Sequence, residues 1–199
     1  MRRNLLSGAA IALASAVTFG LVNVVAKSAD LHPLALASVA YLLAGAALSP
    51  FLLRARFARR DVPLLLTMSL AGGAVAPVLL FAGLLRTTAV DASFLLTAEI
   101  LFAIVLARTF LGERVGARAG LGIVLLGGAA LAVAAATLER GGNAGGDLLG
   151  NALVVAATLA WAIDDVVSTR LAGSYAPPQL SSLKGLVGGG AATRTAPPP

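Results

Sequence analysis

The sequence predicts an all-α polytopic membrane protein with six transmembrane helices. Apolar residues make up 58% of the 199 residues and charged residues only 12%, whereas a soluble domain carries about 25% charged residues. The mean hydropathy of +0.91 also indicates a chain that lies largely in lipid. Six apolar runs are long enough to cross a hydrocarbon core of about 30 Å at about 1.5 Å of rise per residue.

The first two predicted helices follow recognisable start signals. The first, about residues 5–26, comes after Arg2 and Arg3 and contains no charge. Because this run is longer than the apolar core of a signal peptide, we expect it to remain uncleaved. The second, about 34–53, begins after Pro33, which suits a helix start since its missing N–H would have no partner there.

The third predicted helix, about 62–85, contains Gly72, Gly73 and Pro77. Pro77 cannot donate a backbone hydrogen bond, so we expect a helix kink at this position. Membrane helices tolerate such a break where neighbouring groups or water replace the lost bond. Two interpretations of Pro77 stay open, a simple packing kink and a role in a hinge or a cavity wall.

The fourth predicted helix, about 92–111, carries Glu99 as the one charge in its first sixteen residues. Glu99 lies roughly 12 Å along the helix, close to the middle of the bilayer. A carboxylate at that depth costs about 2.5–3.5 kcal/mol on insertion scales, so it should face other helices or a water-filled cavity. Two interpretations of Glu99 stay open. In the functional one it binds a polar or cationic substrate or carries a proton, and in the structural one it only forms a hydrogen bond between helices.

Two further helices and a polar connection complete the predicted set. The fifth helix covers about 117–138, a polar linker covers 140–147, and the sixth helix covers about 148–167. A seventh helix starts but is partial and ends by residue 187. Residues 188–199 form a low-complexity tail of Gly, Ala, Thr, Arg and Pro that is too poor in apolar bulk to cross a bilayer.

The sixth helix carries two adjacent acids, Asp164 and Asp165, which point about 100° apart and cannot both face one point. One is expected to line a pathway, while the other reaches the inner interface or pairs with Lys184 or Arg170. A structural role for both acids stays open. Trp161 is either an anchor or core aromatic, or a platform for a substrate.

The basic residues predict the orientation, because short loops rich in Arg and Lys stay in the cytoplasm. A cytoplasmic N-terminus leaves only Lys27, Arg86 and Arg140 on the outer side. The inner side then collects nine: Arg2, Arg3, Arg54, Arg56, Arg59, Arg60, Arg114, Arg118 and Arg170.

The composition excludes several classes of function. The chain has no cysteine and a single histidine, His32, so we expect no thiol chemistry, no metal site and no cofactor. The net charge of +6 comes from short basic clusters between apolar runs, and we therefore expect no nucleic-acid partner. An intramembrane enzyme would need a nucleophile with a base, paired carboxylates or a metal set. No span supplies histidine or cysteine, and Glu99 and Asp164 come from distant segments.

The two ends of the chain echo one another weakly. The sixth helix comes five spans after the first, an odd number, so it enters the membrane in the opposite direction, as in the inverted repeats of many secondary transporters. A shift of 142 residues aligns Gly8 with Gly150, Phe19 with Trp161, Asn23 with Asp165, and Val24 and Val25 with Val166 and Val167, while Pro33 and Leu34 fall near Pro177 and Pro178.

These features together resemble the drug/metabolite transporter superfamily, in the family of the EamA domain. The resemblance covers roughly residues 8–187, and its most specific part is the fourth helix with its Gly-Glu ending. The residues that carry it are 95–103 (LLTAEILFA), 111–114 (LGER), 120–130, 160–165 (AWAIDD) and 184–187 (KGLV).

The resemblance implies a fold of two inverted five-helix repeats. It also implies that small metabolites or drugs cross the cytoplasmic (inner) membrane by alternating access. This transport would be coupled to protons or other ions, or would proceed by exchange. Residues 1–139 would form the first repeat and 148–187 the start of the second. Glu99, Trp161, Asp164, Asp165 and Lys184 are then the expected substrate or ion pathway.

The chain departs from this plan because it holds one whole repeat and only the start of another. We therefore expect a truncated product, and a non-transporting fragment, inactive or acting through assembly with another chain, is the alternative function. The expected partners are the lipid bilayer and a small metabolite. The substrate, the direction of transport, the coupling ion and the choice between a single copy and a homo-oligomer stay open.

Overall fold

The computed structural model describes residues 13–14, 17–18, 21, 33–53, 55–112, 116–139 and 147–195. It divides into two compact units, Met1–Leu31 and His32–Pro199. In the first unit the few described residues are helical, and the rest of the predicted helix over 5–26 lies outside the described residues. Every predicted site residue belongs to the second unit.

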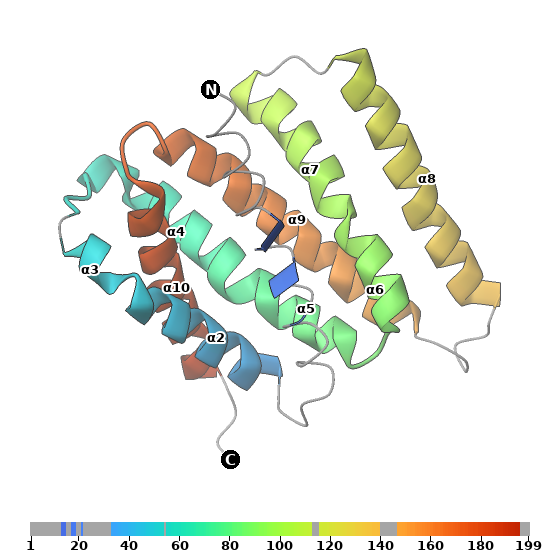
Figure 1. The fold of residues 1–199 in the computed structure, drawn as a ribbon, viewed down its shortest axis with the longest axis horizontal. Coiled ribbons are helices and arrows are strands. Elements are labelled where there is room, and N and C mark those ends of the chain that lie inside the picture. Colours follow the sequence, from blue (N-terminus) through green and yellow to red (C-terminus); the bar gives the residue numbers. More distant parts are fainter. Residues whose placement is uncertain are drawn as a thin grey trace. The chain divides into compact units, whose positions relative to one another are not determined.

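Within the described ranges the elements of the second unit are all helical (Figure 1). The α-helices are α2 (Pro33–Ala47), α3 (Ser49–Leu52), α4 (Val62–Leu70), α5 (Ala76–Leu84), α6 (Ala89–Leu96), α7 (Ala98–Leu106), α8 (Ala117–Glu139), α9 (Leu148–Leu171) and α10 (Pro177–Thr195). Shorter turns complete them: the 3₁₀ turn η1 (Arg59–Asp61) and the π-helical turns η2 (Ala71–Val75) and η3 (Ala107–Leu111).

Three continuous helical runs among the described residues are long and apolar enough to cross a membrane. They are Arg59–Leu84, Ala89–Leu111 and Leu148–Leu171, and they correspond to the third, fourth and sixth predicted helices. Two other apolar helices, Ala35–Ala47 and Gly120–Ala129, are shorter. The described residues are thus helical apart from turns and short connections, as expected for a multi-pass membrane protein.

Side-chain caps explain where two of these runs begin. Thr88 accepts a hydrogen bond of 2.9 Å from the Asp91 N–H, so α6 starts at Ala89, ahead of the predicted start at about residue 92. Asp147 accepts a hydrogen bond of 2.6 Å from the Gly150 N–H and caps α9 in the same way. Both caps supply an acceptor for N–H groups that have no partner inside the helix.

The last helix is longer than the sequence predicts. We expected it to be partial and to end by residue 187, with a low-complexity tail from 188, but α10 continues to Thr195. Gly188 packs against the backbone of Ser69 and Gly73, and Gly189 packs against Leu42. Close packing of small residues therefore supports a helix whose hydropathy alone is too low to predict it.

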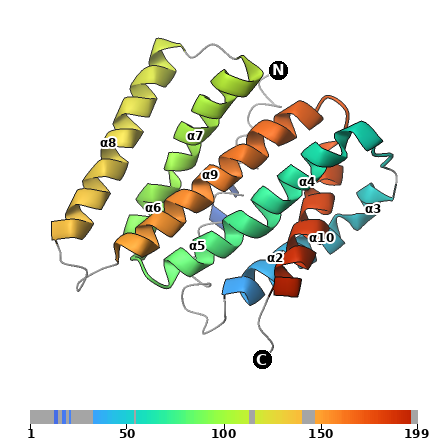
Figure 2. The ribbon, with the colours of Figure 1, turned by 180° about the vertical axis from the view of Figure 1, so that it is seen from behind.

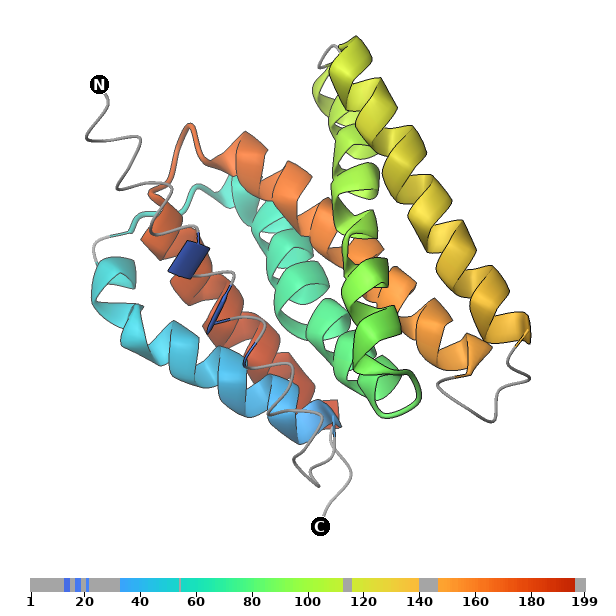
Figure 3. The ribbon, with the colours of Figure 1, turned by 45° about the vertical axis from the view of Figure 1, so that its right-hand side comes forward.

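Helix α9 lies in the middle of the second unit, and Figures 1 and 2 show it between the α4–α5 run and α7. Figure 3 shows α2 and α10 side by side. Helix α8 contacts α6 and α7 and leaves large apolar side chains exposed, among them Leu121, Val124, Leu125 and Leu131. An exposed apolar face of this kind suits contact with lipid.

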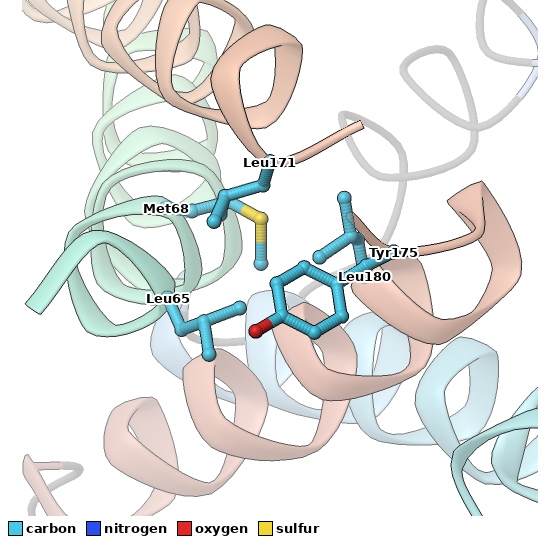
Figure 4. Close-up of a cluster of buried hydrophobic side chains, with 5 residues drawn as sticks. All are labelled: Leu65, Met68, Leu171, Tyr175 and Leu180. Carbon is cyan, nitrogen blue, oxygen red and sulfur yellow. The ribbon is translucent and has the colours of Figure 1, made fainter. Parts of the chain in front are cut away.

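A cluster of buried side chains joins the start of α4 to the turn between α9 and α10 (Figure 4). Its centre is Tyr175, whose hydroxyl donates a hydrogen bond of 2.7 Å to Asp61 Oδ2 and accepts one of 3.0 Å from the Ala58 N–H. The segment before α4 and the α9–α10 turn therefore lie at the same end of the unit. The cluster consists of Leu65, Met68, Leu171, Tyr175 and Leu180.

Candidate functional site

A buried ion pair joins α9 to α10. The Asp164 side chain is only 2% exposed, and its Oδ2 lies 2.6 Å from Nζ of Lys184, whose side chain is 26% exposed. Ser168, one turn further along α9, donates a hydrogen bond of 3.0 Å to the other carboxylate oxygen. Both oxygens of Asp164 thus have partners, as a buried charge requires.

The π-helical turn η2 (Ala71–Val75) lies where Pro77 predicts a break in the third span. In this turn the Ala76 N–H donates to the carbonyl five residues before it. The next donor in that register would be Pro77, which has no N–H, so the Gly72 carbonyl loses its helical partner. The Trp161 indole N–H donates to the Gly72 oxygen over 3.2 Å and replaces the missing bond.

The two glycines of η2 leave room for the ion pair. A β-carbon added at Gly72 would collide with the carboxyl group of Asp164. A β-carbon at Gly73 would lie 2.5 Å from the backbone oxygen of Lys184 and 3.0 Å from its Cγ. Any larger residue at either position would therefore have to displace one partner of the pair.

Trp161 is buried on the same face of α9 as Asp164, one turn before it. Besides the Gly72 oxygen, its Nε1 lies 3.4 Å from the hydroxyl of Tyr41 on α2. The indole therefore connects α2, the third span and α9 in the interior of the unit, next to the ion pair.

Glu99 extends from α7 toward α9 and is partly buried. Its carboxyl group lies within hydrogen-bonding reach of Asp165 and close enough to Asp164 and Lys184 for electrostatic interaction. The two adjacent acids of α9 therefore have different neighbours: Asp164 meets Lys184, and Asp165 meets Glu99. A hydrogen bond between two carboxyl groups needs a proton on one of them, because an ionised carboxylate only accepts.

A cavity of about 510 Å³ lies between α9 and α10 beside these charges. Asp165 and Lys184 both line it, together with the hydroxyl groups of Ser168, Thr169 and Ser181. Other lining residues flank the α9–α10 turn, so one edge of the cavity lies at that end of the unit. The size is within the range of about 300–1,000 Å³ that is usual for small-molecule pockets.

At the opposite end of α9, Arg86 and Asp147 form an exposed ion pair with N–O distances of 2.6 and 2.9 Å. The Asp147 N–H also donates to the Arg86 carbonyl over 2.9 Å. Nearby, the buried Thr87 hydroxyl donates to the side-chain oxygen of Asn151. Hydrogen bonds from Arg86 and from the Gly150 N–H hold the pKa of Asp147 below its ordinary value.

We expect Asp147→Asn to lower the thermal stability near neutral pH, because asparagine keeps the helix cap but loses the charge. The depressed pKa means that the carboxylate stabilises the folded state above its unfolded pKa of about 3.9. This contribution is lost as the pH falls through the folded pKa of Asp147. Melting curves in detergent from neutral pH down to about pH 3 should show the two proteins converging in acid, and a constant difference would contradict the assignment.

The structure brings Glu99, Trp161, Asp164, Asp165 and Lys184 together, and Pro77 lies at the start of α5, directly after η2. Sequence reasoning missed three contributors: Gly72, Ser168 and Tyr41. Ser168 had a signal because it is four residues after Asp164 and shares its helix face, and Gly72 had one because it lies close to Pro77. Within the described part of the chain, no three His, Cys, Asp or Glu side chains are grouped so that they could hold a metal ion.

Comparisons with known proteins indicate a membrane transporter. Residues 6–135 match the EamA-like transporter family. A protein of Methanothermobacter thermautotrophicus, named only as an uncharacterized transporter, is 32% identical over 184 residues, in an alignment that covers 80% of this chain and 52% of the relative. The chain thus spans about half the length of that curated relative. No solved structure matches it.

Proposed function

Because this chain belongs to the EamA-like transporter family, we propose that it carries small metabolites or drugs across the cytoplasmic membrane by alternating access. The family is one of transporters and not of enzymes. The substrate class, the mechanism and the coupling are part of this proposal.

The single observation that carries the proposal is the position of the charged side chains. Glu99 lies on the Ala89–Leu111 run, and Asp164 and Asp165 lie on the Leu148–Leu171 run, each long and apolar enough to cross a membrane. Glu99 is about 15 Å from the start of its run, near the middle. Charged groups at such depth are costly, face the protein interior and are typical of substrate or ion pathways.

The arrangement of the charges supports coupling to a proton. Lys184 neutralises Asp164. Among the described residues it is also the one cation that acts on Glu99 and Asp165, which face each other. A proton, or the cationic group of a substrate, would balance this pair of acids. We infer that Glu99 and Asp165 bind the coupling proton and that the adjoining cavity admits the substrate.

The two ends of the second unit differ in charge, which supports the predicted orientation of its helices. The Tyr175–Asp61 hydrogen bond brings the basic segment with Arg56, Arg59 and Arg60 to the α9–α10 turn. Arg86 lies at the other end, where it pairs with Asp147. The positive-inside rule then assigns the end rich in arginine to the cytoplasm, and with it the edge of the cavity at the α9–α10 turn.

Transport should be lost in Glu99→Gln. The amide keeps the size and polarity of the side chain but cannot carry a proton at neutral pH. Proteoliposomes with an imposed proton gradient would be tested with a panel of amino acids, nucleosides, sugars and organic cations. We expect at least one compound to show saturable flux in the wild type, and a loss of at least about tenfold in the variant.

Glu139→Gln is the matched control, because Glu139 is an exposed acid at the end of α8. It should retain wild-type flux, and both variants should be present in the membrane at equal amounts. Flux that is unchanged in Glu99→Gln would remove Glu99 from the mechanism. A wild-type protein that transports no compound of the panel would count against the proposed function itself.

The half-length alignment favours a second candidate function. The chain covers 52% of the relative that it matches, so a fragment without transport, or one that acts by assembling with another chain, is the alternative proposal. Comparing flux through this chain with flux through a version extended to ten spans distinguishes the two. Activity that appears only in the extended version would support the alternative.

A further inference from the structure

Helices α2 and α10 touch backbone to backbone. A β-carbon added at Gly45 would lie 2.6 Å from the Leu186 nitrogen, and one added at Gly185 would lie 2.6 Å from Gly45 Cα. The buried Ser182 hydroxyl donates a hydrogen bond of 2.9 Å to the Gly45 carbonyl. The crossing (Figure 3) therefore has no room for side chains between the two helices.

The two helices that cross here also share a sequence pattern. A shift of 144 residues superposes 33–47 on 177–191 and leaves six identical positions among fifteen. The shift lies close to the weak echo of 142 residues found between the first and sixth predicted helices. The identical pairs are Pro33 and Pro177, Leu36 and Leu180, Ser38 and Ser182, Leu42 and Leu186, Gly45 and Gly189, and Ala47 and Ala191.

The contacts follow the same shift. The Gly45 position lies 2.6 Å from the Leu186 nitrogen, and the shift converts this contact into one between Gly189 and the Leu42 nitrogen, which the structure contains at 2.9 Å. The shift also converts Tyr41 into Gly185, and these two residues contact each other. Because the shift exchanges these two residues, it converts their contact into itself. Such a contact lies on a two-fold axis, and here that axis relates two antiparallel helices.

We propose that this crossing of α2 and α10 is the fixed contact of the transport cycle, around which the two ends open in turn. The proposal rests on the proposed transport function. Inverted repeats produce the two faces of a transporter by exchanging their conformations. A contact on the axis that relates the repeats is converted into itself by that exchange, so it stays the same in both states.

The contacts at the two ends differ from the crossing in kind. At one end the exposed Arg86–Asp147 ion pair joins the α5–α6 turn to the start of α9. At the other end the Tyr175 hydroxyl donates a hydrogen bond to Asp61. The exposed ion pair and this hydrogen bond can be replaced by bonds to water at little cost. Close backbone packing occurs at one glycine beside Arg86, Gly150, whereas the crossing has it at Gly45, Gly185 and Gly189.

Disulfide cross-links test the proposal, and the chain has no cysteine to remove first. Leu42→Cys with Gly189→Cys would bridge the crossing, where the Gly189 β-carbon position lies 2.9 Å from Leu42 Cγ. Arg86→Cys with Asp147→Cys is the matched pair at one end, where the two backbones are hydrogen-bonded. A disulfide needs two β-carbons about 3.5–4.5 Å apart, and each pair joins residues whose atoms are in direct contact.

After oxidation we expect the crossing disulfide to form in the membrane and to leave flux of the transported compound within about twofold of the reduced protein. The end disulfide should reduce flux at least about tenfold, and reduction should restore it. Loss of flux on oxidising the crossing pair would overturn the proposal. Failure of that disulfide to form in folded, membrane-inserted protein would overturn it too.

Spin labels avoid the crowded crossing in case the cysteine pair does not fold. Leu43 on α2 and Thr193 on α10 are exposed, as are Val90 on α6 and Leu148 on α9. Pulsed electron paramagnetic resonance in liposomes should show one distance population for the first pair, and two for the second when the transported compound is added. A second population in the α2–α10 pair would count against the fixed crossing alone, whereas absence of wild-type flux counts against the proposed function.

Discussion

Replacing Lys184 by methionine is expected to lower the free energy of unfolding by about 3–5 kcal/mol, as breaking a buried ion pair usually does. The change removes the ammonium group 2.6 Å from Asp164 and leaves a carboxylate that is 2% exposed without its counter-charge. Methionine keeps an unbranched side chain beside Gly73, so the loss concerns charge more than packing. Circular dichroism during a titration of SDS into detergent measures the difference.

The double substitution Asp164→Asn with Lys184→Met is the matched control. It removes both charges, and replacing a buried ion pair by neutral groups often changes stability little. We therefore expect most of the lost stability to return. Flux should stay low, because the charges beside the cavity are absent. Wild-type stability in Lys184→Met alone would show that the ion pair is not buried in the folded protein.

The sequence predicted the helical class and the principal charged residues because both depend on local information. An apolar run identifies a span by its length, and Glu99, Asp164 and Asp165 are conspicuous because charges inside such runs are rare. The pairing of the two acids of α9 could not be predicted. Adjacent helix residues point in different directions, and only the packing of α7 and α10 decides that Asp164 meets Lys184.

The glycines were harder to interpret than the charges. Gly72 and Gly73 in the sequence indicate a weak point next to Pro77, but the atoms that approach Gly72 come from Trp161 and Asp164, about ninety residues away. The length of α10 was missed for the same reason. Hydropathy counts apolar bulk along one helix, whereas Gly188 and its neighbours are stabilised by contacts with other helices.

Alanine at Gly72 is expected to lower the free energy of unfolding by about 1–3 kcal/mol, the usual cost of overpacking an interior. The added β-carbon would occupy the position of the Asp164 carboxyl group. That group cannot turn away freely, because Lys184 and Ser168 hold its two oxygens. The same substitution should reduce flux, since the ion pair would have to shift. SDS titration and the proteoliposome assay measure the two effects.

Gly128→Ala is the matched control, because Gly128 lies on α8 with open space around its β-carbon position. Alanine there should stabilise the helix by about 0.5–1 kcal/mol, since glycine loses more backbone freedom on folding. The two substitutions add the same methyl group with opposite expected signs. A gain of stability at both positions would mean that the third span does not pack closely against Asp164, contrary to the proposed site.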